Sequence, residues 1–311
     1  MKKALVTALV HPLLKQGLEA KGWQVVVRET ITREQLLAEV NEYQGLVITT
    51  RLQIDSEVFQ KAKALEWVGR LGSGMEIVDT ETALGLGIGC FSSPEGNRDA
   101  VAEHCLGMLL SLMHHIPRAA GEVKAGKWIR EANRGVELGG KTVGIIGYGN
   151  TGSAFARLLE PFGVTVLAHD KYRFGFAKGF VREASLERIQ HYANVISLHL
   201  PLTSETQHYA GMDFFNALGQ QPFFLNASRG GVVQTEALIA ALDNGRIAAA
   251  GIDVLENEDL SSYKEEEWDK LNRLTGHQNV IVTPHIAGYS QESLRKMAEI
   301  LLDKLVGAGK L

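Results

Sequence analysis

The stretch Lys141–Leu159, "KTVGIIGYGNTGSAFARLL", joins an apolar run to a helical run through a glycine-rich turn. Gly147, Gly149 and Gly152 match the spacing GxGxxG. In this pattern the first glycine permits a tight turn, the second lets the backbone approach a pyrophosphate, and the third lets helix and strand pack closely. The same turn also occurs as a purely structural strand-to-helix connection. The surrounding sequence therefore has to decide between the two interpretations.

The sequence after the turn favours a dinucleotide site. A second apolar run, "TVLAHD", ends in Asp170, eighteen residues after Gly152. A carboxylate there can accept hydrogen bonds from the adenosine ribose hydroxyls and would repel a 2'-phosphate. The N–H groups at the start of the intervening helix suit phosphates. We therefore predict a Rossmann-type site for NAD, although Lys171 and Arg173 beside Asp170 leave use of NADP open.

The amino-acid composition limits the classes of protein to which the chain can belong. The chain has 311 residues, 45% of them hydrophobic, and a net charge of −4 without a basic run, which predicts no nucleic-acid partner. Its two cysteines lack metal-ligand spacing, so we expect no metal site and a reducing, cytoplasmic environment. The N-terminus is more typical of a first strand than of a signal peptide, and the most apolar helix is too short to cross a bilayer.

Alternating strand and helix patterns divide the chain into two series. The first covers residues 1–95, and the second starts at "KTVGIIG" and ends at "NVIVTP". One long apolar helix from Asn97 to His115, with Asn97 as its N-cap, is predicted between them. We predict an α/β protein with two doubly wound parallel sheets. A Rossmann NAD-binding domain (97–288) would be inserted into a flavodoxin-like substrate domain (1–96 and 289–311). A single sheet of more than ten strands is the less favoured alternative.

Polar residues stand at the ends of the later predicted strands. Arg229 follows "FFLNAS", Asp253 stands near the end of "AAAGIDV" with Glu258 five residues on, and His285 follows Pro284. Singly, each has an ordinary explanation as a surface arginine, a turn cap, an acidic loop residue or a packed histidine. Together, and downstream of a dinucleotide motif, they supply what alcohol oxidation needs, because a group must take the hydroxyl proton as the hydride leaves.

A series of blocks then gives a resemblance over nearly the whole chain. The blocks are "GRLGSGMEIVD", "GNRDAVAEHCLGMLL", "GKTVGIIGYGNTG", "HLPLTSET", "NASRGGVVQTEALIAAL", "AGIDVLENE" and "TPHIAGYS". In this order they resemble the D-isomer-specific 2-hydroxyacid dehydrogenase family, which includes phosphoglycerate, glycerate, formate and D-lactate dehydrogenases. Two departures stand out: Asp259 follows Glu258 where the family often has proline, and "GSGME" replaces a commoner loop.

The resemblance implies roles for particular residues. His285 would be the acid-base residue, Glu258 would hold its imidazole in one tautomer and stabilise the charged form, and Arg229 would bind the substrate's carboxylate and carbonyl oxygen. Backbone N–H groups of Ser73 and Gly74 would bind the same carboxylate, so that the cleft between the domains would have to close. The positions expected to contact the cofactor are Gly147, Gly149, Asn150, Thr151, Gly152, Asp170, Pro201, Ala227, Ser228, Arg229, Asp253, His285 and Gly288.

The substrate is the least determined part. Arg51 resembles a position that phosphoglycerate dehydrogenases use for the distal substituent, although it is equally interpretable as a solvated loop arginine. The expected reaction is oxidation of 3-phosphoglycerate to 3-phosphohydroxypyruvate, as in serine biosynthesis, in a homodimer without a regulatory domain. The resemblance and the apolar helix that starts at Asn97 together suggest a two-fold dimer built largely on the cofactor domains. Glycerate or hydroxypyruvate, glyoxylate, D-lactate and erythronate 4-phosphate remain alternatives. So does a different class, a non-catalytic NAD-sensing protein similar to the family's corepressor relatives.

Overall fold

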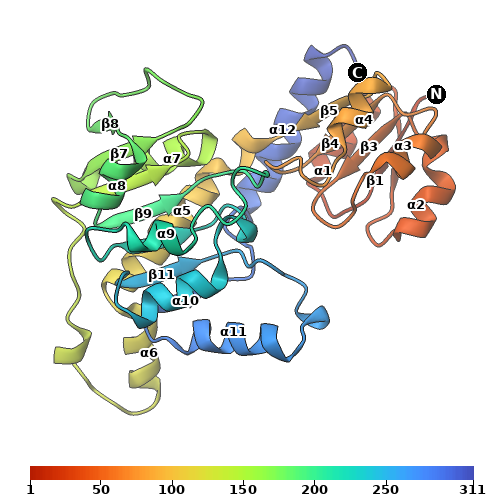
Figure 1. Cartoon of the computed structure of the whole chain (residues 1–311). Helices are drawn as coiled ribbons and strands as arrows, with labels where there is room; N and C mark the ends of the chain where they lie inside the picture. Colours follow the sequence, from red (N-terminus) through yellow and green to blue (C-terminus); the bar gives the residue numbers. More distant parts are fainter. The chain divides into compact units, whose positions relative to one another are not determined.

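The computed structural model describes residues 1–311, which divide into two compact units (Figure 1). Unit 1 comprises Met1–Arg98 and Gly288–Leu311, and unit 2 comprises Asp99–Ala287. The predicted domain bounds differ from these by at most two residues. Unit 2 thus interrupts unit 1 in the sequence.

Unit 1 is built on a five-stranded parallel sheet of order β2-β1-β3-β4-β5. Alternate side chains of each strand enter two separate cores, as the two-residue repeat of a strand requires: Leu5 and Leu46 on one face, Ala4 and Trp67 on the other. The strands are β1 (Lys3–Val6), β2 (Gln24–Val27), β3 (Gly45–Ile48), β4 (Trp67–Arg70) and β5 (Gly89–Ser92), and the helices are α1 (Pro12–Ala20), α2 (Arg33–Glu39), η1 (Val40–Glu42), α3 (Ser56–Lys61), α4 (Thr80–Gly85) and α12 (Gln291–Gly307). The C-terminal helix α12 lies against α1 and completes the second core.

Unit 2 is built on a seven-stranded parallel sheet of order β12-β11-β10-β9-β6-β7-β8. Its strands are β6 (Thr142–Ile146), β7 (Thr165–His169), β8 (Val181–Glu183), β9 (Val195–Leu198), β10 (Phe223–Asn226), β11 (Ala249–Ile252) and β12 (Val280–Val282). Its helices are α6 (Ile116–Lys124), η2 (Glu131–Asn133), α7 (Asn150–Leu159), η3 (Glu160–Phe162), α8 (Leu186–Tyr192), α9 (Met212–Asn216), η4 (Gly230–Val232), α10 (Thr235–Asp243), η5 (Leu260–Ser262) and α11 (Glu265–Gly276). The strand order reverses between β6 and β9, and parallel sheets bind ligands at the carboxyl ends of the strands beside such a reversal.

The helix between the two predicted series differs from its prediction at both ends. Helix α5 runs from Pro94 to Met113, so Asn97 lies inside it and is not its N-cap. Proline is favoured in the first helical turn because its fixed φ suits a helix and its missing N–H would be unbonded there. At the other end His115 adopts a left-handed conformation, with φ of 53°, which separates α5 from α6. The helix thus begins and ends earlier in the sequence than predicted, and α6 is a separate helix that follows it.

The apolar face of α5 is explained by packing within unit 2. Val101, Cys105, Leu109 and Met113 are buried in the core that α5 shares with α7 and one face of the seven-stranded sheet. The apolarity of this helix is consequently no argument for a subunit interface, contrary to our interpretation of the sequence. No helix of the chain combines the length and the apolarity needed to cross a membrane.

Candidate active site

The glycine-rich turn after β6 has the geometry of a phosphate-binding turn. Gly147 has φ of +92°, and a Cβ there would overlap the carbonyl group of His199. A Cβ on Gly152 would overlap the carbonyl oxygen of Gly147, whereas a Cβ on Gly149 would meet no atom within 4 Å. Helix α7 begins at Asn150 with no side-chain cap and no acidic residue in its first turn. The turn thus leaves open space beside uncapped helical N–H groups, which fits the pyrophosphate of NAD.

Asp170 lies beside this turn, at the end of β7. Its carboxylate accepts hydrogen bonds from the main-chain N–H groups of Tyr148 (2.9 Å), Tyr172 (3.0 Å) and Arg173 (3.1 Å). A pocket of about 490 Å³ adjoins it, and Arg173 and Arg188 contribute to its lining. Because two guanidinium groups line this pocket, the negative charge of Asp170 has to outweigh them if NAD is to be preferred over NADP.

We therefore expect Asp170→Ala to reduce the preference for NAD over NADP by roughly tenfold or more, since a hydrogen bond to a charged group contributes about 1.5–3 kcal/mol. Titration of both dinucleotides, followed by protein fluorescence or calorimetry, measures the change. Asp170→Asn, which keeps an acceptor without the charge, should lie between wild type and Asp170→Ala. Equal affinity of the wild-type protein for the two dinucleotides would contradict the role of Asp170.

His199 follows β9 at the same edge of the sheet and is almost entirely buried. Its Nε2 lies 3.0 Å from Ser197 Oγ, and its ring packs against Phe155. Burial lowers the pKa of His199 from 6.5 to about 4. The unfolded chain therefore binds this proton more readily than the folded protein between about pH 6.5 and 4.

We expect this histidine to make the protein less stable by up to about 3 kcal/mol as pH falls from 6.5 to 4, with no further loss from this group below that range. The sign follows from the lowered folded-state pKa, because the charged form is favoured only after unfolding. Urea denaturation at pH 7, 5.5 and 4.5 should show the fall, and His199→Gln should flatten it. An unchanged pH slope in that variant would show that His199 is not its source.

His285 and Glu258 are brought together at the carboxyl end of β12. His285 Nδ1 lies 2.8 Å from Glu258 Oε2, and about a third of the histidine side chain is exposed. The backbone of His285 is left-handed, with φ of 54°, an uncommon conformation for a residue other than glycine. Such conformations persist where surrounding contacts enforce them, and they cluster at functional sites.

Asp253 supplies the contacts that hold the turn of His285. Its carboxylate is 1% exposed and accepts hydrogen bonds from Ile286 N (2.9 Å), Ala287 N (2.8 Å) and Thr283 Oγ1 (2.5 Å). The main-chain N–H of His285 donates to the carbonyl oxygen of Asp253 at 2.7 Å. Asp253 therefore shapes the backbone around His285, and the contact with the cofactor expected of it stays a prediction.

Arg229 follows β10 on a turn organised by Asn226. Asn226 is fully buried, its Oδ1 accepts from Ser228 N (3.1 Å) and Oγ (2.8 Å), and its Nδ2 donates to Arg229 O (3.0 Å). The next residue, Gly230, lies directly against the carbonyl group of Leu255. The Arg229 turn and the loop that carries Glu258 are thus in contact. Reasoning from sequence missed Asn226 and Thr283, although a polar residue at the end of an apolar strand was the available signal.

The remaining predicted positions fall on the same edge of unit 2 or in unit 1. Ala227, Ser228, Asn150, Thr151 and Pro201 all follow strands β10, β6 or β9 at the carboxyl edge. Gly288 is the first residue of the second segment of unit 1. The cofactor contacts expected of these residues stay predictions.

In unit 1 the predicted substrate residues follow β3 and β4. Ser73 and Gly74 come after β4, in a loop held by Ser93, whose Oγ accepts from Gly72 N at 3.2 Å. The guanidinium of Arg51 donates to three main-chain carbonyl oxygens, those of Ile31 (2.6 Å), Thr7 (2.9 Å) and Glu29 (3.0 Å). Arg51 therefore joins the loops that follow three strands, and its contact with substrate stays a prediction.

A dinucleotide turn at a strand-order reversal, with a histidine–glutamate pair at neighbouring strand ends, defines the class of nicotinamide-dependent oxidoreductases. The model of the D-isomer specific 2-hydroxyacid dehydrogenase NAD binding domain matches residues 106–287. The chain belongs to this family, and the predicted cofactor, NAD, is confirmed.

Individual relatives agree with this assignment. The D-3-phosphoglycerate dehydrogenase of Archaeoglobus fulgidus is 33% identical over 310 residues, which are 99% of this chain and 57% of that protein. This chain thus spans little more than half the length of that relative. Among solved structures, a Thermus thermophilus protein has a TM-score of 0.85 at 30% identity, covering 98% of this chain and 96% of that one. The D-lactate dehydrogenase of Aquifex aeolicus, complexed with NAD and lactic acid, has a TM-score of 0.85 at 25% identity, covering 99% and 96%.

Proposed function

We propose that this protein is a cytoplasmic NAD-dependent D-2-hydroxyacid dehydrogenase that oxidises 3-phosphoglycerate to 3-phosphohydroxypyruvate. The main evidence for the reaction class is the 2.8 Å contact between His285 Nδ1 and Glu258 Oε2. This pair lies beside the Arg229 turn in an NAD-binding domain. The resemblance to D-3-phosphoglycerate dehydrogenases over 99% of the chain supports the choice of substrate. A relative of the same fold that binds lactic acid supports the 2-hydroxy acid group as the common element.

In this proposal each of the three side chains has a task. With Nδ1 of His285 donating to Glu258, its Nε2 is the nitrogen left to take the substrate's hydroxyl proton in oxidation and to return it in reduction. Glu258 favours the imidazolium that forms, because a negative charge lies next to it. Arg229 binds the carboxylate with a guanidinium fork. NAD, when bound, accepts the hydride that leaves the substrate carbon.

A substrate screen tests the proposal. NADH absorbance is followed with 3-phosphoglycerate, glycerate and D-lactate, and in the reverse direction with hydroxypyruvate and glyoxylate. We expect the highest kcat/KM for 3-phosphoglycerate. A higher value for another acid would keep the reaction class and replace the substrate. No turnover with any acid, together with intact NAD binding, would favour a non-catalytic NAD-sensing protein.

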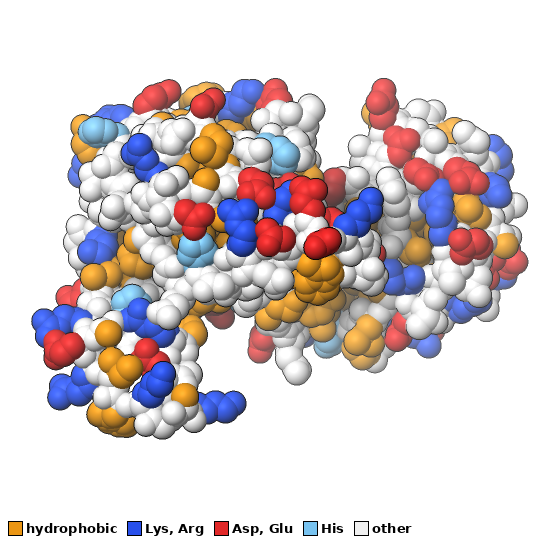
Figure 2. Space-filling model, turned by 60° about the horizontal axis from the view of Figure 1, so that its bottom comes forward, with side chains coloured by type: hydrophobic (Ala, Val, Ile, Leu, Met, Phe, Trp, Pro, Cys, Tyr) orange, Lys and Arg blue, Asp and Glu red, His pale blue; other side chains and the backbone are white.

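A homodimer is part of the proposal, and the structure offers a surface for it. The arm formed by residues 116–138 projects from the body of unit 2 (Figure 1), and no residue of α6 is buried. Figure 2 shows apolar and basic side chains mixed on the projecting lobe. The exposed apolar side chains of the arm are Ile116, Val123, Trp128, Ile129 and Val136. Trp128 is 81% exposed, and several exposed apolar side chains gathered on one segment, unlike a single one, mark a protein contact.

Trp128→Glu is expected to raise the dimer dissociation constant by roughly 30-fold or more, because an interface tryptophan commonly contributes about 2 kcal/mol. Sedimentation equilibrium from 0.1 to 10 times the wild-type dissociation constant measures the change. Leu84→Glu, at a side chain that is 79% exposed in unit 1, is the matched control and should leave the dimer intact. A wild-type protein that stays monomeric at micromolar concentration would contradict the proposed dimer.

A further inference from the structure

The loop that carries Glu258 is fixed at both of its ends, although Glu258 itself is not packed. The carboxylate of Glu258 is 45% exposed, and its contact with His285 is made at the tip of a half-solvated side chain. Packing therefore contributes little to its orientation. The backbone on either side has to hold this carboxylate within reach of the imidazole.

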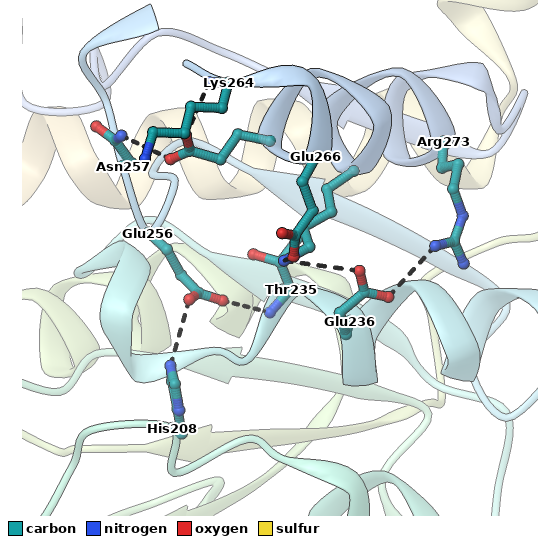
Figure 3. A network of polar contacts seen from close by, with 10 residues as sticks. His208, Thr235, Glu236, Glu256, Asn257, Lys264, Glu266 and Arg273 are labelled. Carbon is teal, nitrogen blue, oxygen red and sulfur yellow. Dashed lines mark hydrogen bonds and ion pairs between the residues drawn. The ribbon is translucent and has the colours of Figure 1, made fainter. Parts of the chain in front are cut away.

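One end of the loop is anchored to α10. Glu256 Oε1 accepts from the main-chain N–H of Thr235 (2.5 Å), and its Oε2 lies 3.3 Å from Nε2 of His208 (Figure 3). Thr235 is the first residue of α10, so this carboxylate also satisfies an N–H group that the helix leaves unbonded. Figure 3 shows Glu256 and Asn257 on successive positions of the loop, reaching different neighbours.

Asn257 joins the loop to the elements that follow it. Its Nδ2 donates to Glu267 Oε1 of α11 (2.9 Å) and to Ser262 Oγ of η5 (3.0 Å). Its Oδ1 accepts from Asp259 N (3.0 Å), and its carbonyl oxygen accepts from the hydroxyl of Tyr263 (2.5 Å). The side-chain amide thus uses both of its hydrogen-bonding ends, on the residue directly before Glu258.

The bond from Asp259 N to Asn257 Oδ1 closes a turn around Glu258. An asparagine that bonds the backbone two residues later forms an Asx-turn, which fixes the residue between them. Asp259 makes a second bond of the same kind, because its Oδ1 accepts hydrogen bonds from Ser261 N (3.1 Å) and Oγ (2.5 Å), two residues later. Proline at position 259 could not donate this N–H, so the turn depends on the departure from the family's common pattern.

We propose that Asn257 is a positioning residue, whose amide holds the backbone of Glu258 so that the carboxylate meets Nδ1 of His285. This inference rests on the proposed function, since it assigns Asn257 to the same acid-base pair. A hydrogen bond at 2.8 Å tolerates little displacement, and a shift of about 1 Å in a reacting group can cost roughly 100-fold in rate. Asn257 acts only through Glu258 and does not itself take part in proton transfer.

The test compares Asn257→Ala with wild type, and then repeats the comparison in a Glu258→Ala background. We expect Asn257→Ala to lower kcat roughly 10- to 100-fold, with the KM for NAD changed less than about twofold. In the Glu258→Ala background the same substitution should lower kcat by less than about threefold, because the group being positioned is already lost. Asn257→Asp, which keeps the acceptor for Asp259 N, should restore part of the activity.

Asn272→Ala is the matched control, because Asn272 is an exposed asparagine on α11, the helix to which Asn257 bonds. Hydrogen exchange of residues 254–264 gives a readout that needs no turnover. It should be faster in Asn257→Ala and unchanged in Asn272→Ala, with the rest of unit 2 as in wild type. Equal losses of kcat in both backgrounds, or unchanged exchange in the loop, would overturn the proposal. Absence of turnover in the wild type would count against the proposed function, whereas the exchange result would still test the loop.

Discussion

His285→Ala is expected to lower kcat by roughly 100-fold or more, the usual scale for loss of a positioned acid-base group. His285 is the imidazole at the carboxyl end of β12, with its Nδ1 bonded to Glu258 at 2.8 Å and its backbone held by the buried carboxylate of Asp253. Alanine removes the group that takes the hydroxyl proton. NAD binding should be retained, because the turn from Gly147 to Gly152 and Asp170 lie on other strands.

The measurement is the initial rate with the best acid from the screen, together with NAD affinity by calorimetry. His277→Ala is the matched control, since His277 precedes β12 at the opposite end and pairs with Asp243 at 3.3 Å. Glu258→Gln should lose less activity than His285→Ala, because the amide keeps a hydrogen-bond acceptor and loses only the charge. Near-normal turnover of His285→Ala would show that His285 is not the acid-base residue.

Alanine at Gly149 is expected to weaken NAD binding, whereas alanine at Gly152 is expected to lower the stability of the fold. A Cβ at Gly149 meets no atom of the protein within 4 Å, so Gly149→Ala should leave the free energy of unfolding nearly unchanged. The added methyl group would instead stand where the pyrophosphate approaches the backbone. We expect the Kd for NAD to rise roughly tenfold or more, which corresponds to about 1.4 kcal/mol.

Gly152→Ala should act on the fold itself. The added Cβ overlaps the carbonyl oxygen of Gly147, so α7 has to move away from β6, at a cost of about 3 kcal/mol in stability. Urea denaturation and NAD titration of both variants separate the two effects. If Gly149→Ala bound NAD as tightly as wild type, the pyrophosphate would not approach this part of the backbone. If Gly152→Ala were as stable as wild type, the close contact would be unimportant.

Local patterns in the sequence were sufficient for most of the fold. Short apolar runs bounded by glycine and followed by amphipathic segments predicted two parallel sheets, and the structure contains them. The spacing of Gly147, Gly149 and Gly152 predicted the strand–turn–helix unit that β6 and α7 form. These features follow from periodicity and backbone freedom, which depend on neighbouring residues only.

The ends of the linking helix were predicted less well. Apolar residues recur through the stretch from Asn97 to His115, and Pro117, two residues further on, was the available signal for the break at His115. How the helix packs is set by residues distant in the sequence, which a local pattern does not describe. For the same reason the apolar face of α5 suggested a subunit contact, whereas it is covered by α7 and the sheet of its own unit.

The sequence by itself determined the family, the NAD turn and the kinds of residue that stand at the strand ends, because these depend on order and spacing along the chain. Only the tertiary structure decided how those residues meet. Glu258 and His285 are 27 positions apart, and their 2.8 Å contact exists because β11 and β12 are adjacent parallel strands whose carboxyl ends share one edge. Likewise, Asp253 holds the turn of His285, Arg51 holds three loops, and Asn257 holds Glu258 through hydrogen bonds that spacing along the chain does not specify.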